Sequence, residues 1–201
     1  VELYHKTGGK VICVSTWDYS DQKAYAFRKK EGVNLKELRS VSDPFGGIDK
    51  TKAQDLGYEL LHGEEWIEQE VDILIPAAIE NQITEHNAIS IHQKVKLIAE
   101  GANAPTTSEA ESILSDKGVK IIPDLLSNSG GMICDYFEQV QNNMNYYWSK
   151  DEVLSKLDVK LTEAYTEVSN FGIMNNVNLR DAAYLISVDK VAKACEARSW
   201  V

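Results

Sequence analysis

The chain's length of 201 residues suits one domain or one domain plus an appendage, and 43% apolar with 26% charged residues is the balance of an ordinary soluble protein. Its formal net charge of −10 would repel phosphates, so the composition argues against nucleic acid as a partner. The sequence contains no apolar run of membrane length and no signal-peptide pattern, so we expect no membrane contact.

Cysteines and histidines show no metal-binding pattern. The three cysteines (Cys13, Cys134 and Cys195) form no C-x-x-C pair. His86 and His92 are six positions apart, which places them on different faces of a helix. We therefore expect reduced thiols in a cytoplasmic protein, and no metal site.

The first segment, Val1–Lys6, is typical of the end of a helix, and Thr7, Gly8 and Gly9 terminate it. Val1 is not a natural initiator. We therefore expect a fragment truncated at its N-terminus.

Four short runs rich in Val and Ile predict strands: Lys10–Ser15, Val71–Ile75, Val95–Ala99 and Val119–Ile122. Runs that are apolar almost throughout are typical of strands buried on both faces of a parallel sheet. Helical segments between the later runs give the βαβ rhythm of an α/β domain. Between the first two runs, we expect a helix over Leu35–Leu38 and one further strand around Tyr25–Phe27.

Capping residues predict the later helices. Thr106 and Glu109 match a capping box at the start of a helix that Gly118 ends, and Ser149 with Glu152 matches another. The long helix after Ser149 has an apolar face of Leu154, Leu157, Leu161, Ala164 and Val168. A last helix, capped by Asn178, is predicted to turn four residues inward: Leu185, Val188, Ala192 and Cys195.

The residues that follow the strands have unusual chemistry, and ligands of open parallel sheets bind at the carboxyl ends of strands. Ala77 and Ala78 follow the second run and would let a flat group approach the backbone, although a tight turn would look the same. Asn103 follows the third run, and its amide suits a ribose hydroxyl or a carboxamide, although asparagine is also common in turns. Asn128, in Asn-Ser-Gly-Gly, follows the fourth run and is typical either of close ligand approach or of a flexible loop.

Three strings along the chain, IPAAIENQIT, AEGANAPTTSEAESIL and IPDLLSNSGG with the later YFEQVQ, resemble the glutamate, leucine, phenylalanine and valine dehydrogenase family. The glutamate dehydrogenase branch is the most similar, through Tyr136-Phe137-Glu138 and the ending RDAAY…SWV. The resemblance covers nearly the whole chain.

The resemblance implies an α/β fold: a Rossmann-like parallel sheet that lacks its first strand, with C-terminal amphipathic helices. It implies an incomplete dinucleotide-binding domain over residues 1–148, and C-terminal helices over 149–201 that pack on the sheet or on an absent substrate domain. The implied reaction is oxidative deamination of an amino acid, L-glutamate in the closest branch, to a 2-oxo acid and ammonia. A homo-oligomer, commonly a hexamer in the glutamate branch, is also implied.

The family's roles can be carried over to matching positions. Ala77 and Ala78 would line the cofactor groove, Asn103 would bond the nicotinamide ribose, and Asn128 would bond the carboxamide. Asp124 is expected to be a structural hydrogen-bonder rather than a base. The family's catalytic lysine and aspartate belong to the N-terminal domain, so we expect no catalytic residue here and no activity from this chain alone.

One departure from the family pattern concerns the cofactor. After the first strand, where NAD enzymes often carry an acid for the adenosine ribose, Thr16 stands in the acid's place and Asp18 comes later. Asp18 in contact with the ribose would favour NAD, whereas the basic cluster Arg28–Lys30 would invite the 2′-phosphate of NADP. We expect NAD, with NADP as the alternative.

The second departure concerns the substrate. Asp135 stands where the family usually has a serine before Tyr-Phe-Glu, a serine that binds the substrate's side-chain carboxylate in the glutamate branch. Two facing carboxylates repel each other unless one is protonated. Four interpretations remain: a different substrate, an Asp135 turned away from the pocket, a subunit that no longer catalyses, or a helix-start aspartate favoured by the helix dipole.

Two functions therefore stay open. The first is an active dehydrogenase subunit, favoured by the Asn103 and Asn128 segments. The second is a non-catalytic regulatory or scaffolding paralogue of such an enzyme, favoured by Asp135 and the altered region at Thr16.

Overall fold

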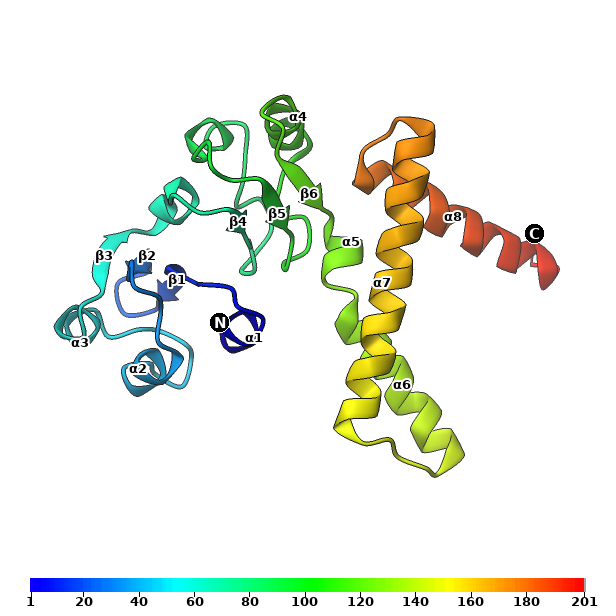
Figure 1. The fold of residues 1–201 in the computed structure, drawn as a ribbon, viewed down its shortest axis with the longest axis horizontal. Coiled ribbons are helices and arrows are strands. Elements are labelled where there is room, and N and C mark those ends of the chain that lie inside the picture. The colour runs from blue at the N-terminus through cyan, green and yellow to red at the C-terminus, as the bar shows by residue number, and fades with distance from the viewer. Residues whose placement is uncertain (201) are drawn as a thin grey trace. The chain divides into compact units, whose positions relative to one another are not determined.

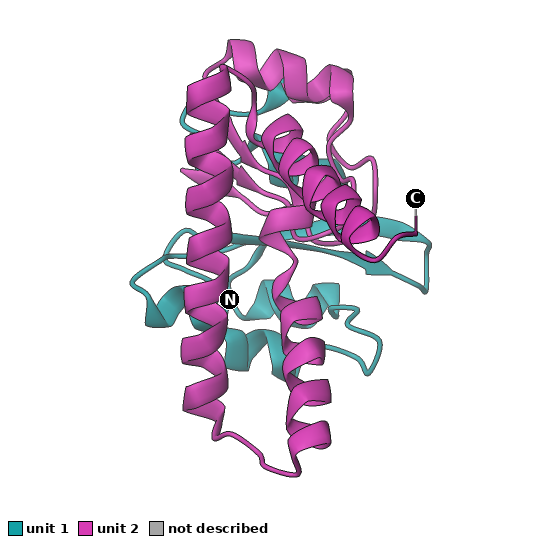
Figure 2. Cartoon of the chain, turned by 90° about the vertical axis from the view of Figure 1, so that its right-hand side faces the viewer, with its two compact units in different colours: residues 1–71, 89–95 teal, residues 72–88, 96–201 magenta. Residues whose placement is uncertain are grey.

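The computed structural model describes residues 1–200, and its chain divides into two compact units. Unit 1 contains residues 1–71 and 89–95, and unit 2 contains residues 72–88 and the chain from residue 96 onward, as coloured in Figure 2. The domain boundary expected at residues 148/149 falls inside unit 2, just before its longest helix.

Unit 1 is built on an antiparallel sheet of β1 (Cys13–Asp18), β2 (Lys23–Arg28) and β3 (Glu59–His62), in the order β1-β2-β3 (Figure 1). Its helical elements are α1 (Glu2–Lys6), α2 (Leu35–Ser40), α3 (Lys50–Asp55) and the 3-10 helix η1 (Gly63–Glu68). The helix expected at the N-terminus, the strand around Tyr25–Phe27 and the helix over Leu35–Leu38 are confirmed. The sequence did not predict β3 or α3.

The prediction that the first run, Lys10–Ser15, joins the parallel sheet is wrong. β1 turns back through Gln22, whose φ of 55° reverses the chain, and pairs with β2 so that Thr16 lies opposite Tyr25. The burial of β1 alternates toward its carboxyl end, as expected for a strand with one face covered. The short connection to β2 therefore decided the pairing more strongly than the apolar composition did.

The core of unit 1 lies against this sheet and is made by Phe27, Val33, Leu38, Val41, Ile48, Ala53 and Tyr58. Side-chain caps begin the two short helices that contribute to it. Asn34 accepts the backbone N–H groups of Lys36 and Glu37 at the start of α2, and Asp49 accepts that of Lys52 at the start of α3.

Burial raises the pKa of the Cys13 thiol in β1 from its ordinary value of 9.0 to about 11. The folded state therefore holds the thiol proton more tightly than the unfolded chain, so this stabilisation is complete below pH 9 and is lost as the pH rises toward 11. We expect the free energy of unfolding to fall by roughly 2 kcal/mol over that range relative to Cys13→Ala. Urea unfolding at pH 8, 9, 10 and 11 measures this. Cys195→Ala is the control and should keep the wild-type loss; identical pH profiles for wild type and Cys13→Ala would contradict the prediction.

Unit 2 contains the parallel sheet. Its strands β4 (Ile73–Leu74), β5 (Leu97–Ala99) and β6 (Lys120–Ile122) pair in that order, so three of the four predicted runs contribute to it. The 3-10 helix η2 (Ala88–Ser90) lies between β4 and β5 in the chain, and α4 (Ser108–Asp116) connects β5 to β6. The α4 cap is Thr107, which accepts the N–H of Ala110, and not Thr106 as predicted, because Thr106 is buried in a bridge with Ile83.

Four helices follow the sheet: α5 (Asp124–Ser127), α6 (Gly130–Met144), α7 (Lys150–Asn175) and α8 (Leu179–Ala197). The predicted Ser149–Glu152 capping box and the Asn178 cap are both confirmed. None of the helices within residues 1–200 is long and apolar enough to span a membrane.

The prediction of which face of α8 is buried is wrong. Leu185 and Val188 are exposed, and the helix instead buries Ala182 and Ala183 in a cluster with Leu126 and Val168. Helical spacing places Leu185 and Val188 on one face, but it does not say which face meets α7. The small alanines allow the close approach of the two helices.

Candidate functional site

The loops that follow β4 and β5 are joined through one acceptor. The Pro76 carbonyl oxygen accepts the backbone N–H groups of Gly101 and Ala102, each at 2.9 Å. A Cβ atom added to Gly101 would lie 3.0 Å from the Cβ of Ala77, which is closer than most Cβ contacts, so a side chain at position 101 would push Ala77 aside. Ala77 and Ala78 remain exposed beside this junction. The small residues singled out in the sequence therefore share one surface.

Asn103 and Asn128 meet at the same edge of the sheet. The Nδ2 of Asn128 donates to the Oδ1 of Asn103 at 2.8 Å, and also reaches the Gly101 carbonyl at 3.5 Å. Within residues 1–200, no protein group bonds the Nδ2 of Asn103 or the Oδ1 of Asn128. The pair thus presents a donor beside an acceptor, which is the complement of a carboxamide or of a hydroxyl that donates and accepts.

Asp124 fixes the turn that carries Asn103. Its Oδ2 accepts the backbone N–H of Ala104 at 2.8 Å, and its Oδ1 accepts that of Leu125 at 2.8 Å. Ala104 has a φ of 45°, in the left-handed region that a residue with a side chain seldom adopts. Both carboxylate oxygens of Asp124 therefore accept hydrogen bonds from backbone N–H groups.

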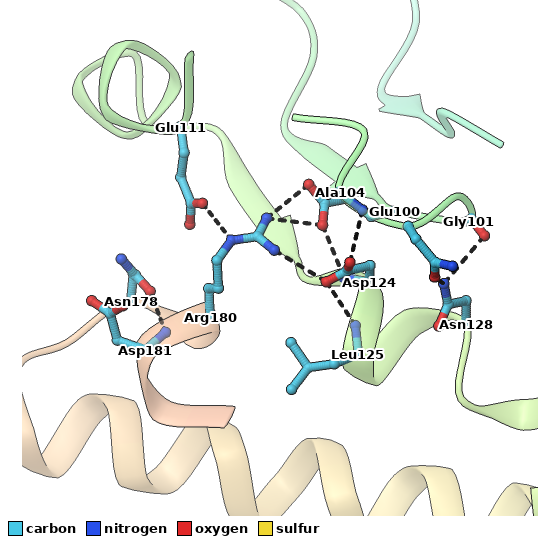
Figure 3. A network of polar contacts seen from close by, with 11 residues as sticks. Glu100, Gly101, Ala104, Glu111, Asp124, Leu125, Asn128, Asn178, Arg180 and Asp181 are labelled. Carbon is cyan, nitrogen blue, oxygen red and sulfur yellow. Dashed lines mark hydrogen bonds and ion pairs between the residues drawn. The ribbon is translucent and has the colours of Figure 1, made fainter. Parts of the chain in front are cut away.

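Arg180, in the first turn of α8, stands at the centre of a polar network that the sequence did not reveal (Figure 3). Its Nη2 donates to both carboxylate oxygens of Glu100 at 2.8 Å, its Nε to Glu111 at 2.6 Å and its Nη1 to Asp124 at 3.1 Å. Glu100 also accepts the backbone N–H of Asp124 at 2.8 Å. The available signal was a glutamate between a buried strand and Gly101, but nothing in the sequence paired it with an arginine 80 positions away.

The network places one guanidinium among three carboxylates. The side chain of Glu100 is 0% exposed, and those of Glu111, Asp124 and Arg180 are 15%, 15% and 18% exposed. Burial opposes the charge on Arg180, but its hydrogen bonds to Glu111 and Glu100 outweigh this and raise the pKa of the guanidinium above its ordinary value. Arg180 therefore stays charged at any pH that the protein meets.

Known proteins give the family to which this arrangement belongs. The family model "Glutamate/Leucine/Phenylalanine/Valine dehydrogenase" matches residues 1–199. The chain belongs to this dehydrogenase family. It is 37% identical over 201 residues to the cryptic catabolic NAD-specific glutamate dehydrogenase of Bacillus subtilis (strain 168) and 36% identical over 200 residues to the NAD-specific glutamate dehydrogenase of Peptoniphilus asaccharolyticus. Both matches cover 100% of the chain but only 44% and 46% of those proteins, so the chain spans less than half the length of these relatives.

Solved structures agree with the family. The crystal structure of the glutamate dehydrogenase from Peptoniphilus asaccharolyticus matches with a TM-score of 0.77 at 32% identity, covering 100% of this chain and 44% of that one. The hetero-hexameric glutamate dehydrogenase from Thermus thermophilus matches with a TM-score of 0.83 at 24% identity over 98% of this chain and 44% of that one, which supports the fold alone.

The other two residues predicted to bind the family's cofactor, Thr16 and Asp18, lie in unit 1, whereas Ala77, Ala78, Asn103 and Asn128 lie in unit 2. Thr16 donates through its hydroxyl to the Gly46 carbonyl at 2.9 Å.

The Asp18 carboxylate accepts a hydrogen bond from the Lys50 ammonium at 2.7 Å. It also accepts hydrogen bonds from the backbone N–H and the hydroxyl of Ser20. The hydrogen bonds from Lys50 and Ser20 hold the pKa of Asp18 well below its ordinary value. Lys50 also bonds Asp21 at 2.7 Å and lies 4.3 Å from the centre of the Tyr25 ring. Asp18 is thus ionised and already well supplied with donors.

The basic cluster Arg28–Lys30 is largely engaged within the protein. Arg28 donates to Glu59 and to Gln69, and Lys29 forms an ion pair with Glu37 at 2.7 Å. These pairings reduce the positive charge that is left to attract a phosphate.

Asp135, which stands where the family usually has a serine, is exposed on α6. It lies five positions after Gly130, the first residue of the helix, and the first turn of α6 contains no acidic residue. The interpretation of Asp135 as a helix-start aspartate is therefore wrong, because the dipole effect is confined to the first turn. Among residues 1–200, no three His, Cys, Asp or Glu side chains are grouped so that they could hold a metal ion.

Proposed function

We propose that this chain supplies the nicotinamide-binding part of an NAD-dependent glutamate dehydrogenase, which converts L-glutamate to a 2-oxo acid and ammonia. The observation that carries the proposal is the Asn103–Asn128 pair, with its Nδ2···Oδ1 bond of 2.8 Å. It lies at the carboxyl ends of β5 and β6, where ligands of parallel sheets bind. The nicotinamide, when bound, accepts the hydride.

The residues present fit such a cofactor. Asn128 would bond the carboxamide and Asn103 the ribose, while the exposed Ala77 and Ala78 leave room for a flat group beside Gly101. The chain's own task is to bind and orient the ring, because the hydride can transfer only when the reacting atoms are held close together. We assign no catalytic acid or base to this chain.

NAD is favoured over NADP by two observations. The relatives from Bacillus subtilis and Peptoniphilus asaccharolyticus are both named as NAD-specific. In addition, Arg28 and Lys29, the cations that would attract a 2′-phosphate, are held by Glu59 and Glu37. We also propose L-glutamate as the substrate, on the basis of the relatives' names. We propose that the protein assembles as a homo-oligomer, a hexamer. A cytoplasmic location is proposed from the reduced thiols that the composition indicates.

The second candidate function is a non-catalytic paralogue with a regulatory or scaffolding role. The observation that favours it is the bonding of Asp18. Its carboxylate already accepts hydrogen bonds from Lys50 and Ser20, so fewer of its lone pairs are left to accept a ribose hydroxyl. An exposed carboxylate at Asp135, in place of the family's serine, favours it as well.

Nucleotide binding, on which the proposed function depends, can be measured on this chain. We expect the side-chain amide NMR signals of Asn103 and Asn128 to shift on titration with NAD and with nicotinamide mononucleotide. Asn128→Ala should weaken binding by roughly tenfold, because one hydrogen bond to a polar ligand is lost. Asn170→Ala, an exposed asparagine on α7, is the matched control and should bind as the wild type does. Equal binding by the Asn128→Ala variant, or no response to either nucleotide, would contradict the proposed function.

A further inference from the structure

We propose that Arg180 is a positioning residue, which holds the turn carrying Asn103 in its binding-competent shape from the first turn of α8. The proposal rests on the proposed function only for what the turn binds. Arg180 does not contact Asn103 or Asn128; its partners are Glu100, Glu111 and Asp124. Its effect on the site must therefore pass through these carboxylates.

The path from Arg180 to the turn consists of short hydrogen bonds. Arg180 bonds Asp124 at 3.1 Å, and Asp124 bonds the N–H of Ala104, the residue next to Asn103, at 2.8 Å. A second branch runs through Glu100. Its carboxylate accepts hydrogen bonds from Arg180 at 2.8 Å and from the backbone N–H of Asp124 at 2.8 Å. Both branches converge on Asp124, whose oxygens have fixed positions as a result (Figure 3).

The turn needs this support because of its backbone conformation. Ala104 has a φ of 45°, and a residue with a side chain persists in this region only where its surroundings hold it. The bond from Asp124 to the Ala104 N–H supplies that restraint directly. If Asp124 moved, Ala104 would relax, and Asn103 would no longer face Asn128.

Charge explains why Asp124 depends on Arg180. Glu100, Glu111 and Asp124 converge on one guanidinium, and Glu100 is fully buried. Without the cation, the carboxylates would repel each other in a poorly solvated place, and Asp124, with a side chain 15% exposed against 0% for Glu100, is the one of these two that lies nearer to solvent. Lysine would restore the charge but not the fork of donors that reaches three carboxylates at once.

Amide hydrogen exchange tests the proposal on the 201-residue chain. We expect Arg180→Met to accelerate exchange of the Ala104 N–H by at least about tenfold, since its restraint is lost, and Arg180→Lys to have an intermediate effect. The Val119 N–H, which bonds the carbonyl of the buried Leu114 and lies outside the Arg180 network, serves as the reference for global opening. Lys190→Met is the matched control, because it removes an exposed ion pair with Glu167 from the same helix. The control should leave Ala104 unchanged.

Two outcomes would overturn the proposal. One is an Ala104 exchange rate in Arg180→Met equal to that of the wild type. The other is an equal acceleration at Ala104 and Val119 in both Arg180 variants, which would show that Arg180 only stabilises the unit as a whole.

A titration of the same variants with nicotinamide mononucleotide separates this proposal from the proposed function. Selective exchange at Ala104 combined with a normal Asn103 response in Arg180→Met would contradict the positioning role. If the wild type gave no response, the proposed function would fail, while selective exchange at Ala104 would still support Arg180 as the residue that holds the turn.

Discussion

Gly63→Ala is expected to lower the free energy of unfolding by about 3 kcal/mol or more, because it forces an atom into the backbone of a neighbouring strand. The added Cβ would lie 2.3 Å from the Cβ of Ala24 and 2.6 Å from the carbonyl carbon and oxygen of the same residue. Ala24 belongs to β2, the central strand of the antiparallel sheet, so it cannot move without disturbing its pairing with β1. All three atoms belong to the backbone or the Cβ of Ala24, and none is the end of a flexible side chain that could move away.

Urea unfolding followed by circular dichroism measures this loss. Gly131→Ala is the matched control, because a Cβ there meets nothing within 4 Å and the residue lies inside α6. That substitution should be neutral or stabilise the protein by up to about 1 kcal/mol, since alanine favours a helix over glycine. Equal stability of the Gly63→Ala variant and the wild type would show that the contact between η1 and β2 is loose.

The second large effect is expected at Glu100. Glu100→Ala should cost about 3 kcal/mol, because it leaves Arg180 short of its most buried partner and the Asp124 N–H without an acceptor. Removing one member of a buried ion pair is far more costly than removing an exposed pair. The same urea experiment measures it.

Two variants make the result at Glu100 specific. Glu100→Gln keeps one oxygen acceptor in place and should lose less stability than Glu100→Ala. Glu167→Ala breaks the exposed ion pair with Lys190 and should cost under about 1 kcal/mol. If Glu100→Ala cost no more than Glu167→Ala, the Arg180 network would be a surface feature rather than a buried support.

Local signals in the sequence predicted the parallel part of the fold. The Val- and Ile-rich runs after residue 70 became β4, β5 and β6, and the caps at Ser149 and Asn178 begin α7 and α8. Each of these features depends on residues that are neighbours in the chain. Local chemistry was sufficient there.

Features that depend on distant residues were missed or wrong. β1 pairs with β2 because of a reversal at Gln22, and β3 joins only through its distant partner β2. The buried face of α8 depends on where α7 lies, and spacing within α8 does not contain that information. Arg180 was missed for the same reason: its three carboxylate partners lie 56 to 80 positions earlier in the chain.

The shared acceptor at Pro76 has a consequence for how this part of the protein can change over generations. Because one carbonyl receives both Gly101 and Ala102, a residue inserted into either loop would cost the other loop its anchor. The sizes of residues 77 and 101 are linked as well, since any bulk added at one position comes from the space of the other. Substitutions in the two loops should therefore be correlated. Among relatives, we expect positions 76–78 and 101–102 to vary together or not at all, although they are far apart in the chain.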